Sequence, residues 1–305
     1  MLLAMQGAVS QGILWGIMVL GVFITYKLLD IADLTVDGSF ALGGCVCAVM
    51  LVNGHMNPWL ALLAGAGAGV LAGAVTGLLH TVFDIPAILS GILTQIALWS
   101  VNLRVMGKSN VPLLQVDTIF LSISKLTGLP QTTVTIVLGA VFAVGVIALL
   151  YWFFGTEIGS ALRATGNNER MSRALGINTH ITKLLALMLS NGLVGLSGAL
   201  VCQSQKYADI NMGTGAIVIG LAAIVIGEVL GRLTPGKLRS FSSRLIAAVV
   251  GSVVYFLIRA IVLQLGMDAN DMKLLSAAIV VLALSVPVLL ERSQLKRSYS
   301  KGGEA

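Results

Sequence analysis

Residues 131–154 read QTTVTIVLGAVFAVGVIALLYWFF, a run of 24 residues without one charged side chain. A helix of about 20 apolar residues is long enough to cross the hydrocarbon core of a bilayer. Runs of this kind recur along the chain, and only 10% of its 305 residues are charged, against roughly 25% in an ordinary soluble domain. A soluble domain of this length could not bury so much apolar surface, so lipid is the expected solvent.

Nine runs are long and apolar enough to be interpreted as membrane spans, which predicts an all-α, polytopic membrane protein of eight to ten helices. They cover residues 5–26, 38–52, 58–79, 85–103, 131–154, 184–203, 214–231, 245–264 and 274–290. The second run is short, and it reaches full length only if Asp33 to Asp37 joins it as a broken or partly unwound segment. The connections are short, so we expect a single transmembrane domain over residues 1–305.

Lysine and arginine predict the orientation, because cytoplasmic loops of membrane proteins are enriched in them. The loop 155–183, the segment 232–244 and the tail 291–305 hold most of the basic residues. All three fall on one side of a nine-span chain, which predicts a cytoplasmic C-terminus and an outer N-terminus. The formal charge of +6 then reflects orientation. No basic helix with interleaved aromatic residues is present, so a nucleic-acid partner is not expected.

Gly65, Gly69, Gly73 and Gly77 recur at every fourth residue of the third run and therefore lie on one helix face. Such a face lets the backbone of a neighbouring helix approach closely. The pattern leaves two interpretations open, which are tight static packing and helices that shift against each other.

A weak internal repeat relates ADLT at residues 32–35 to ADIN at residues 208–211, and a glycine-bearing apolar run follows each copy. The predicted topology places the two copies on opposite sides of the membrane, as an inverted repeat requires. Broken helices with free polar ends often hold a substrate, whereas Asp and Ser at such positions also cap ordinary helices. With both interpretations open, the candidate pathway residues are Asp33, Thr35, Asp37, Ser39, Asn211 and Thr214.

The predicted cytoplasmic loop reads GTEIGSALRATGNNERMSRALGINTHITK from residue 155 to residue 183. One helical piece ends near Gly166-Asn167-Asn168, a short helix covers Glu169 to Leu175, Gly176 ends it, and Thr179 is placed to cap the next helix. A short helix bounded by glycine turns suits docking into a groove of a partner protein. The alternative is a solvated connecting loop.

The loop 155–183 and the segment 32–44 both resemble the ABC importer permeases of the branched-chain amino acid and ribose type. Those proteins share a pattern G-x-x-L-R-A-x-G-x-N followed by A-x-x-x-G-I-N, although the spacing after Ala174 is not strictly kept here. The segment ADLTVDGSFALGG, residues 32–44, is similar to the same family's Asp-Leu-Ser/Thr-Val-Gly segment. It is most similar to an uncharacterised subgroup, linked to aromatic amino acids, that carries Asp-Leu-Thr-Val-Asp-Gly-Ser. The resemblance covers about residues 10–290, and it departs from the ribose type in having about nine spans instead of about ten.

The resemblance implies a permease subunit of an ATP-driven importer in a bacterial cytoplasmic (inner) membrane. The expected cargo is a small polar solute, with an amino acid, aromatic ones included, as the first candidate and a sugar or nucleoside as the second. The implied partners are a second permease subunit, in a homodimer or a heterodimer, an ATPase dimer and an extracytoplasmic substrate-binding protein. The loop would dock on the ATPase, or its arginines would only hold it in the cytosol. The residues of this coupling segment are Gly159, Leu162, Arg163, Ala164, Gly166, Asn168, Arg170, Arg173, Gly176, Ile177 and Asn178.

An enzyme with its own nucleotide site is not expected. Gly107-Lys108-Ser109 lacks the upstream glycine of a phosphate-binding loop, and Leu follows Gly236-Lys237. Cys45, Cys47 and Cys202 lie in or beside apolar runs without a second ligand pair, so neither a metal nor a cofactor is expected.

A transporter driven by an ion gradient is the alternative of another class, and it would use charges within the membrane. Glu228 and Arg259 are the two charges inside predicted runs. They differ in depth, which argues against a direct pair. Glu228 is instead expected to pair with Arg232, one helical turn away.

Overall fold

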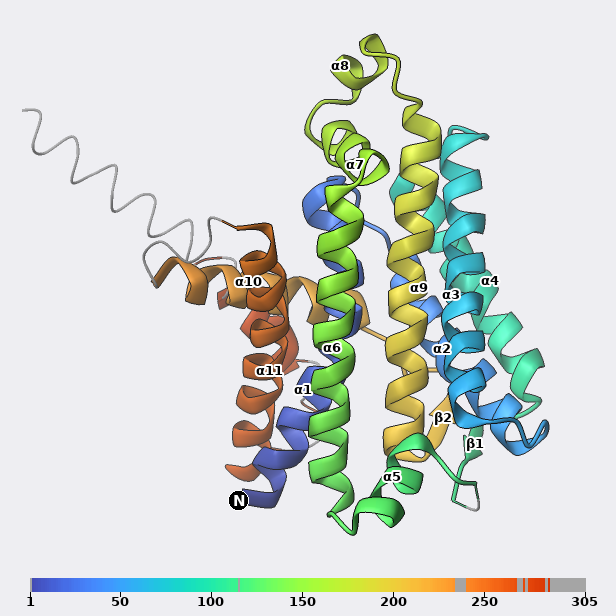
Figure 1. Cartoon of the computed structure of the whole chain (residues 1–305), viewed down its shortest axis with the longest axis vertical. Helices are drawn as coiled ribbons and strands as arrows, with labels where there is room; N and C mark the ends of the chain where they lie inside the picture. The colour runs from blue at the N-terminus through green and yellow to red at the C-terminus, as the bar shows by residue number, and fades with distance from the viewer. Residues whose placement is uncertain are drawn as a thin grey trace, which may run out of the picture.

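The computed structural model describes residues 2–114, 116–233, 240–267, 271, 274–282 and 285. Within these residues the helices are α1 (Leu2–Phe23), α2 (Thr35–Val52), α3 (Pro58–Thr81), α4 (Ala87–Met106), α5 (Ile119–Thr127), α6 (Gln131–Gly155), α7 (Glu157–Asn167), α8 (Glu169–Ala174), α9 (Thr179–Gln205), α10 (Ala216–Leu233) and α11 (Phe241–Gln264). A π-helix, η1 (Ile24–Leu28), extends α1. Two short strands, β1 (Asn110–Pro112) and β2 (Tyr207–Asp209), pair antiparallel at the end of the bundle opposite α7 and α8 (Figure 1).

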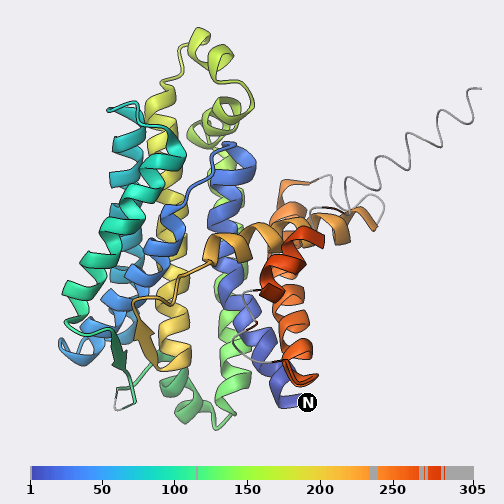
Figure 2. The same ribbon diagram turned by 180° about the vertical axis from the view of Figure 1, so that it is seen from behind.

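Seven helices of the described chain are long and apolar enough to cross a membrane, namely α1 with η1, α2, α3, α4, α6, α9 and α11. Each coincides with a predicted run, so the prediction of an all-α polytopic membrane protein is confirmed. The count of nine is not confirmed. The run 214–231 forms α10, whose apolar stretch Ala216–Gly231 is shorter and which lies across the bundle (Figures 1 and 2). The run 274–290 lies partly outside the described residues.

Three helices form the centre of the bundle. In the most apolar stretch of α1, 78% of the residues are buried, and the share is 72% in α2 and α9, against 28% to 39% in α3, α4, α6 and α11. The outer helices instead expose large apolar side chains, including Leu71 and Trp152. Hydrocarbon accepts such side chains at no cost, so the surface pattern is that of a protein surrounded by lipid.

The glycine face of α3 packs directly on α9. A Cβ atom on Gly69 would overlap the carbonyl oxygen of Asn191, and one on Gly73 would overlap that of Leu187. α2 approaches α9 in the same way, because a Cβ atom on Gly43 would overlap the Gly195 carbonyl. Close packing of α2 and α3 on α9 therefore accounts for the glycine pattern.

The chain is not helical between η1 and α2. Leu29 to Leu34 form no regular element in the described chain, and the N–H of Ile31 reaches back to the carbonyl oxygen of Thr25 at 2.9 Å. The predicted extension of the short second run is present, but Thr35 to Asp37 join α2 as regular helix, and only the residues before Thr35 are unwound.

The glycine packing gives the first prediction. Gly69→Val should lower the midpoint of thermal unfolding by several degrees, because overpacking a tight contact costs about 1–3 kcal/mol. The measurement is thermal unfolding of the purified protein in detergent. Gly67→Val is the matched control, because nothing lies within 4 Å of a Cβ atom at Gly67 on the same helix. Equal midpoints for the two variants would contradict the packing.

Candidate functional site

Asp33 closes a buried hydrogen-bond network between α2, α3 and α9. Its carboxylate accepts hydrogen bonds from the N–H of Thr35 at 2.9 Å and from the Asn191 amide at 2.7 Å. The Thr35 hydroxyl lies 2.7 Å from the Thr76 hydroxyl. Asp33 and Thr35 are buried between helices. Their polar groups therefore join three helices and satisfy the unwound backbone before α2.

Asp37 joins the start of α2 to the start of α10. One carboxylate oxygen accepts from the N–H of Gly215 at 2.8 Å, and the other accepts from the N–H of Ile217 at 2.9 Å. The first N–H groups of a helix have no partner in the helix itself, and a carboxylate there also meets the positive end of the helix dipole. Asp37 therefore supplies from α2 the cap that α10 needs.

The two copies of the weak repeat form the same local turn. The Asp209 carboxylate accepts from the N–H of Asn211 at 2.8 Å, as the Asp33 carboxylate accepts from the N–H of Thr35. A helix start follows each turn, at Thr35 in the first copy and at Ala216 in the second. The sequence similarity thus corresponds to a shared turn geometry, and Asp37 brings the two helix starts together.

A cavity of about 330 Å³ opens beside this junction. The first turn of α2, the middle of α4 and the segment that precedes α10 form its wall. The residues that line it are Asp37, Gly38, Gln95, Ile96, Trp99, Ser100, Asn102, Ile210, Asn211 and Thr214. The wall therefore combines one carboxylate with several neutral hydrogen-bonding groups and one indole.

Asn102 brings an unused acceptor to this wall. Its Nδ2 atom donates to the Gly38 carbonyl at 3.5 Å, whereas its Oδ1 atom has no partner among the described residues. Asn102 is 1% exposed. A buried polar atom without a partner costs about 1–3 kcal/mol, so a bound hydrogen-bond donor would be stabilised here.

The structure brings together half of the predicted pathway residues. Asp37, Asn211 and Thr214 line the cavity. Asp33 and Thr35 do not, because they belong to the packing network. Ser39 is fully buried, and its hydroxyl has no partner among the described residues.

The sequence interpretation missed the wall that α4 contributes. Gln95, Trp99, Ser100 and Asn102 were not predicted, although they line the cavity. The sequence signal for this wall was the presence of two amide side chains, Gln95 and Asn102, inside an apolar run. These polar residues help to give α4 the lowest mean hydropathy, 1.3, among the seven helices of the described chain that are long and apolar enough to cross a membrane.

Glu169 organises the predicted coupling segment. Its carboxylate pairs with Arg173 at 2.7 Å and with Lys183 at 2.8 Å, and it accepts from the Thr179 hydroxyl at 3.3 Å. The hydrogen bond from Lys183, with the charges of Lys183 and Arg173, holds the pKa of Glu169 below its ordinary value, although burial acts in the opposite direction. The Glu169 cluster thus fixes α8 to the start of α9.

Asparagine side chains cap the starts of α8 and α9. Asn168 accepts from the N–H of Met171 at 3.0 Å, and Asn178 accepts from the N–H of His180 at 3.1 Å. The prediction that Thr179 caps α9 is wrong, because Thr179 is its first helical residue and bonds to Glu169 instead. Leu162 is buried, whereas Arg170, Met171 and Leu175 are exposed.

α7 lies directly on the end of η1. A Cβ atom on Gly166 would overlap the Leu28 carbonyl oxygen, so only glycine fits. Arg163 donates to the carbonyl oxygen of Phe154 at 2.8 Å, and its guanidinium lies 5.8 Å from the centre of the Phe241 ring. These residues bind α7 to the bundle.

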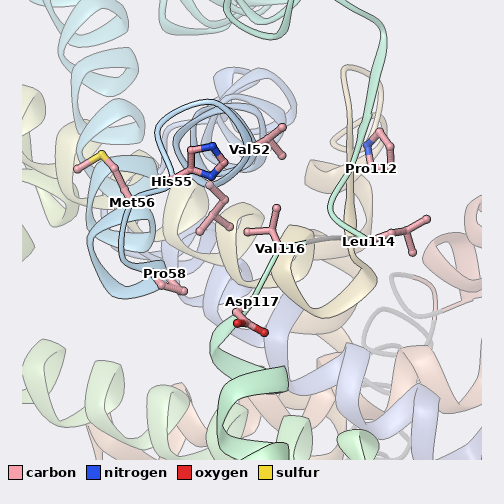
Figure 3. Close-up of a pocket in the computed structure, with 9 residues that line it drawn as sticks. Val52, His55, Met56, Pro58, Pro112, Leu114, Val116 and Asp117 are labelled. Atoms are coloured by element: carbon pink, nitrogen blue, oxygen red, sulfur yellow. The ribbon is translucent and has the colours of Figure 1, made fainter.

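A larger cavity, of about 630 Å³, lies at the end of the bundle that holds β1 and α5. Figure 3 shows His55 and Met56 from the connection of α2 to α3 and Pro58 from the start of α3 on one side, with Leu114 and Val116 across from them. Its wall is mainly apolar, and it contains none of the predicted pathway residues.

The two charges within the predicted runs have separate surroundings. Glu228 pairs with Lys27 of η1 at 2.7 Å. The expected contact of Glu228 with Arg232 falls on a side chain outside the described part of the structure. The Arg259 guanidinium lies 5.9 Å from the centre of the Phe256 ring. Glu228 and Arg259 thus act separately.

Seven helices of the described chain that are long and apolar enough to cross a membrane make this a multi-pass membrane protein, and a polar cavity lies beside two of its helix starts. The family described as "branched-chain amino acid transport system / permease component" matches residues 4–284, and the chain belongs to this family. The resemblance noted in the sequence is thereby confirmed.

Three relatives illustrate the range of this family. A tyrosine transport system permease protein of Clostridioides difficile is 39% identical over 300 residues, which cover 97% of this chain and 96% of the relative. An uncharacterized protein of Rickettsia prowazekii is 30% identical, with 91% and 95% covered. A ribose import permease protein of Escherichia coli is 26% identical, with 83% and 76% covered. No solved structure is significantly similar to the chain.

The Glu169 cluster gives the second prediction. Because folding lowers the pKa of Glu169, its carboxylate stabilises the α8–α9 corner above the ordinary value of 4.5, and this contribution is lost as the pH falls through the lowered value. At pH 7, Glu169→Gln should speed amide hydrogen exchange of residues 169–183 a few-fold, and the difference from wild type should shrink as the pH falls below 4.5 and through the lowered pKa of Glu169. Glu157→Gln is the control, and an equal effect of the two variants would contradict the assignment.

Proposed function

We propose that this chain is the permease subunit of an ATP-driven importer for a small polar solute, with an amino acid as the first candidate. The observation that carries the proposal is the polar cavity where α2 and α10 begin, in a chain of this permease family. The relative described as a tyrosine permease supports an amino acid. Trp99 in the cavity wall adds a face on which an aromatic ring can stack.

The hydrogen-bonding groups of the cavity suit a donor on the solute. The Asp37 carboxylate and the Asn102 Oδ1 atom both accept, and an ammonium group carries three donors. Sugar hydroxyls also donate, and a ribose permease is among the relatives, so a sugar or nucleoside is the second candidate. A transporter driven by an ion gradient is the alternative of another class.

A second permease subunit, most simply a second copy of this chain, would complete the cavity. The cavity opens along α4, where Ile96 is 65% and Trp99 is 48% exposed. A copy packed on this face would close the opening and place two cavities opposite each other. A substrate-binding protein would then approach the end with β1 and α5.

The ATPase dimer would dock at the opposite end, on α7 and α8, and the chain would end on that cytoplasmic side. Exposed Met171 and Leu175 offer apolar contacts beside the charge of Arg170. Arg163 is held by Phe154 and Phe241, and Arg173 by Glu169, so of these three arginines Arg170 is the best placed to meet an acidic group of the partner.

The cavity gives the third prediction. Asn102→Leu should lower ATP-dependent uptake at least tenfold in proteoliposomes that contain the permease with its ATPase and binding protein, because the acceptor is lost at nearly constant volume. Thr135→Val is the control, since that buried hydroxyl bonds to the carbonyl oxygen of Gln131 within α6.

Uptake is measured with labelled tyrosine, ribose and a nucleoside, together with the unfolding midpoint of each variant. Uptake of ribose but not tyrosine would reject the amino acid. Accumulation on an ion gradient without ATP would reject the ATP-driven mechanism.

The docking segment gives the fourth prediction. Met171→Asp and Leu175→Asp together should weaken co-purification of the ATPase at least tenfold, because two apolar contacts are replaced by charges that need water. Leu126→Asp is the matched control, since Leu126 is 87% exposed on α5 at the other end. If the Leu126 variant lost the ATPase while the Met171 and Leu175 double variant kept it, the docking surface would lie at the end with α5, and the proposed assignment would be wrong.

A further inference from the structure

The first turns of α1 lie beside the last turns of α11 (Figure 1). A groove between these two helix ends also has Gln205 of α9 in its wall. Its volume is about 360 Å³. Gly12 contacts the backbone of Val253, and the Ser252 hydroxyl donates to the Gly12 carbonyl at 2.8 Å, so the two helices that form the groove are firmly joined. The groove is therefore a fixed feature of the fold.

Arg259 places a positive charge in this groove. It lies five residues before the end of α11, near the depth where a bilayer changes from hydrocarbon to headgroups. The guanidinium packs over Phe256, and it forms no salt bridge with an acidic residue of the described chain. A charge in a membrane helix is costly unless a partner of opposite sign meets it, so the groove favours an anion.

Amide side chains extend the polar part of the groove. Gln11 and Gln205 are joined by a hydrogen bond of 3.3 Å from Gln205 Nε2 to Gln11 Oε1, and Gln264 also lines the wall. Each amide carries donors besides those used between them. Together with the planar fork of the guanidinium, these donors fit the oxygens of a phosphate.

The rest of the groove is apolar and lined by small or aromatic residues. Gly7 and Ala8 leave space beside α1, and the rings of Trp15 and Phe256 pack with centres 5.5 Å apart. An anion that also carries a long apolar tail would satisfy both parts of the wall. A free phosphate would satisfy only the polar part.

We propose that this groove binds one phospholipid, with its phosphate on Arg259 and an acyl chain along Gly7, Ala8 and Trp15. Among the described residues, no acidic side chain lines the groove, so none is placed to pair with a positively charged headgroup. The site therefore prefers phosphatidylglycerol to phosphatidylcholine. The bound lipid holds α1, α9 and α11 together at the end of the bundle from which the chain continues through β2 to the cavity.

The test is thermal unfolding of the purified full chain in detergent with added phosphatidylglycerol, phosphatidylcholine or inorganic phosphate. Phosphatidylglycerol should raise the wild-type midpoint by about 5 °C more than phosphatidylcholine does, because a ligand of the folded state alone stabilises it by mass action. Arg259→Gln should abolish this preference, and Arg259→Lys should keep part of it. Arg104→Gln is the control, since this exposed arginine lies in the last turn of α4 and not in the groove.

A second readout follows Trp15 directly. In a variant with Trp59, Trp99 and Trp152 replaced by Phe, brominated phosphatidylglycerol should quench the fluorescence of Trp15, and Arg259→Gln should weaken that quenching. Equal responses to both lipids, or equal quenching with and without Arg259, would overturn the proposal. A rise in midpoint with inorganic phosphate as large as with phosphatidylglycerol would identify a free-anion site and reject the lipid. A change from dimer to monomer in Arg259→Gln, without a lipid effect, would make the groove a contact between copies and equally reject it.

Discussion

Asp37 satisfies a backbone that would otherwise be left without partners inside the membrane. The chain between β2 and α10 is not helical, and hydrocarbon offers no water to its N–H groups. The carboxylate of Asp37 accepts from Gly215 and Ile217, and this contact from α2 fixes where α10 starts. The cavity exists because of that contact, since α2, α4 and the segment before α10 surround the place where the helices are interrupted. Asp33 does the same for the interruption before α2, through Thr35 and Asn191.

Much of the fold follows from the length of the apolar runs, because lipid imposes helices of a fixed length on any chain that crosses it. For that reason the seven long helices were predicted to within a few residues. The direction of α10 was not predictable from its composition. It depends on hydrogen bonds to Asp37 and on the pair of Lys27 with Glu228, which join residues about 200 positions apart. Periodicity carries no information on such distant contacts.

The candidate site was predicted in part for the same reason. Asp37, Asn211 and Thr214 stand beside interruptions that the sequence marks with polar residues, and the repeat related those interruptions to each other. The wall from α4 depends on which face of that helix turns toward α2. Gly38 determines this face, because a Cβ atom there would lie 2.9 Å from the Leu98 side chain. Sequence alone indicated that α4 contains amides, and packing decided that Asn102 faces the cavity.

A continuous series of contacts connects α7, where the ATPase is proposed to dock, with the cavity beside α2 and α10. Gly166 of α7 lies against the carbonyl of Leu28, and the next residue toward α1, Lys27, pairs with Glu228 of α10 at 2.7 Å. α10 in turn begins at the cavity, capped by Asp37. A displacement of α7 by a docked protein would therefore press first on η1, which carries an i→i+5 ladder that differs from the α-helix before it. η1 contacts α10 through Lys27 and Glu228, and it continues to α2 through the unwound residues before Thr35. A movement of η1 would therefore shift both helix starts at the cavity.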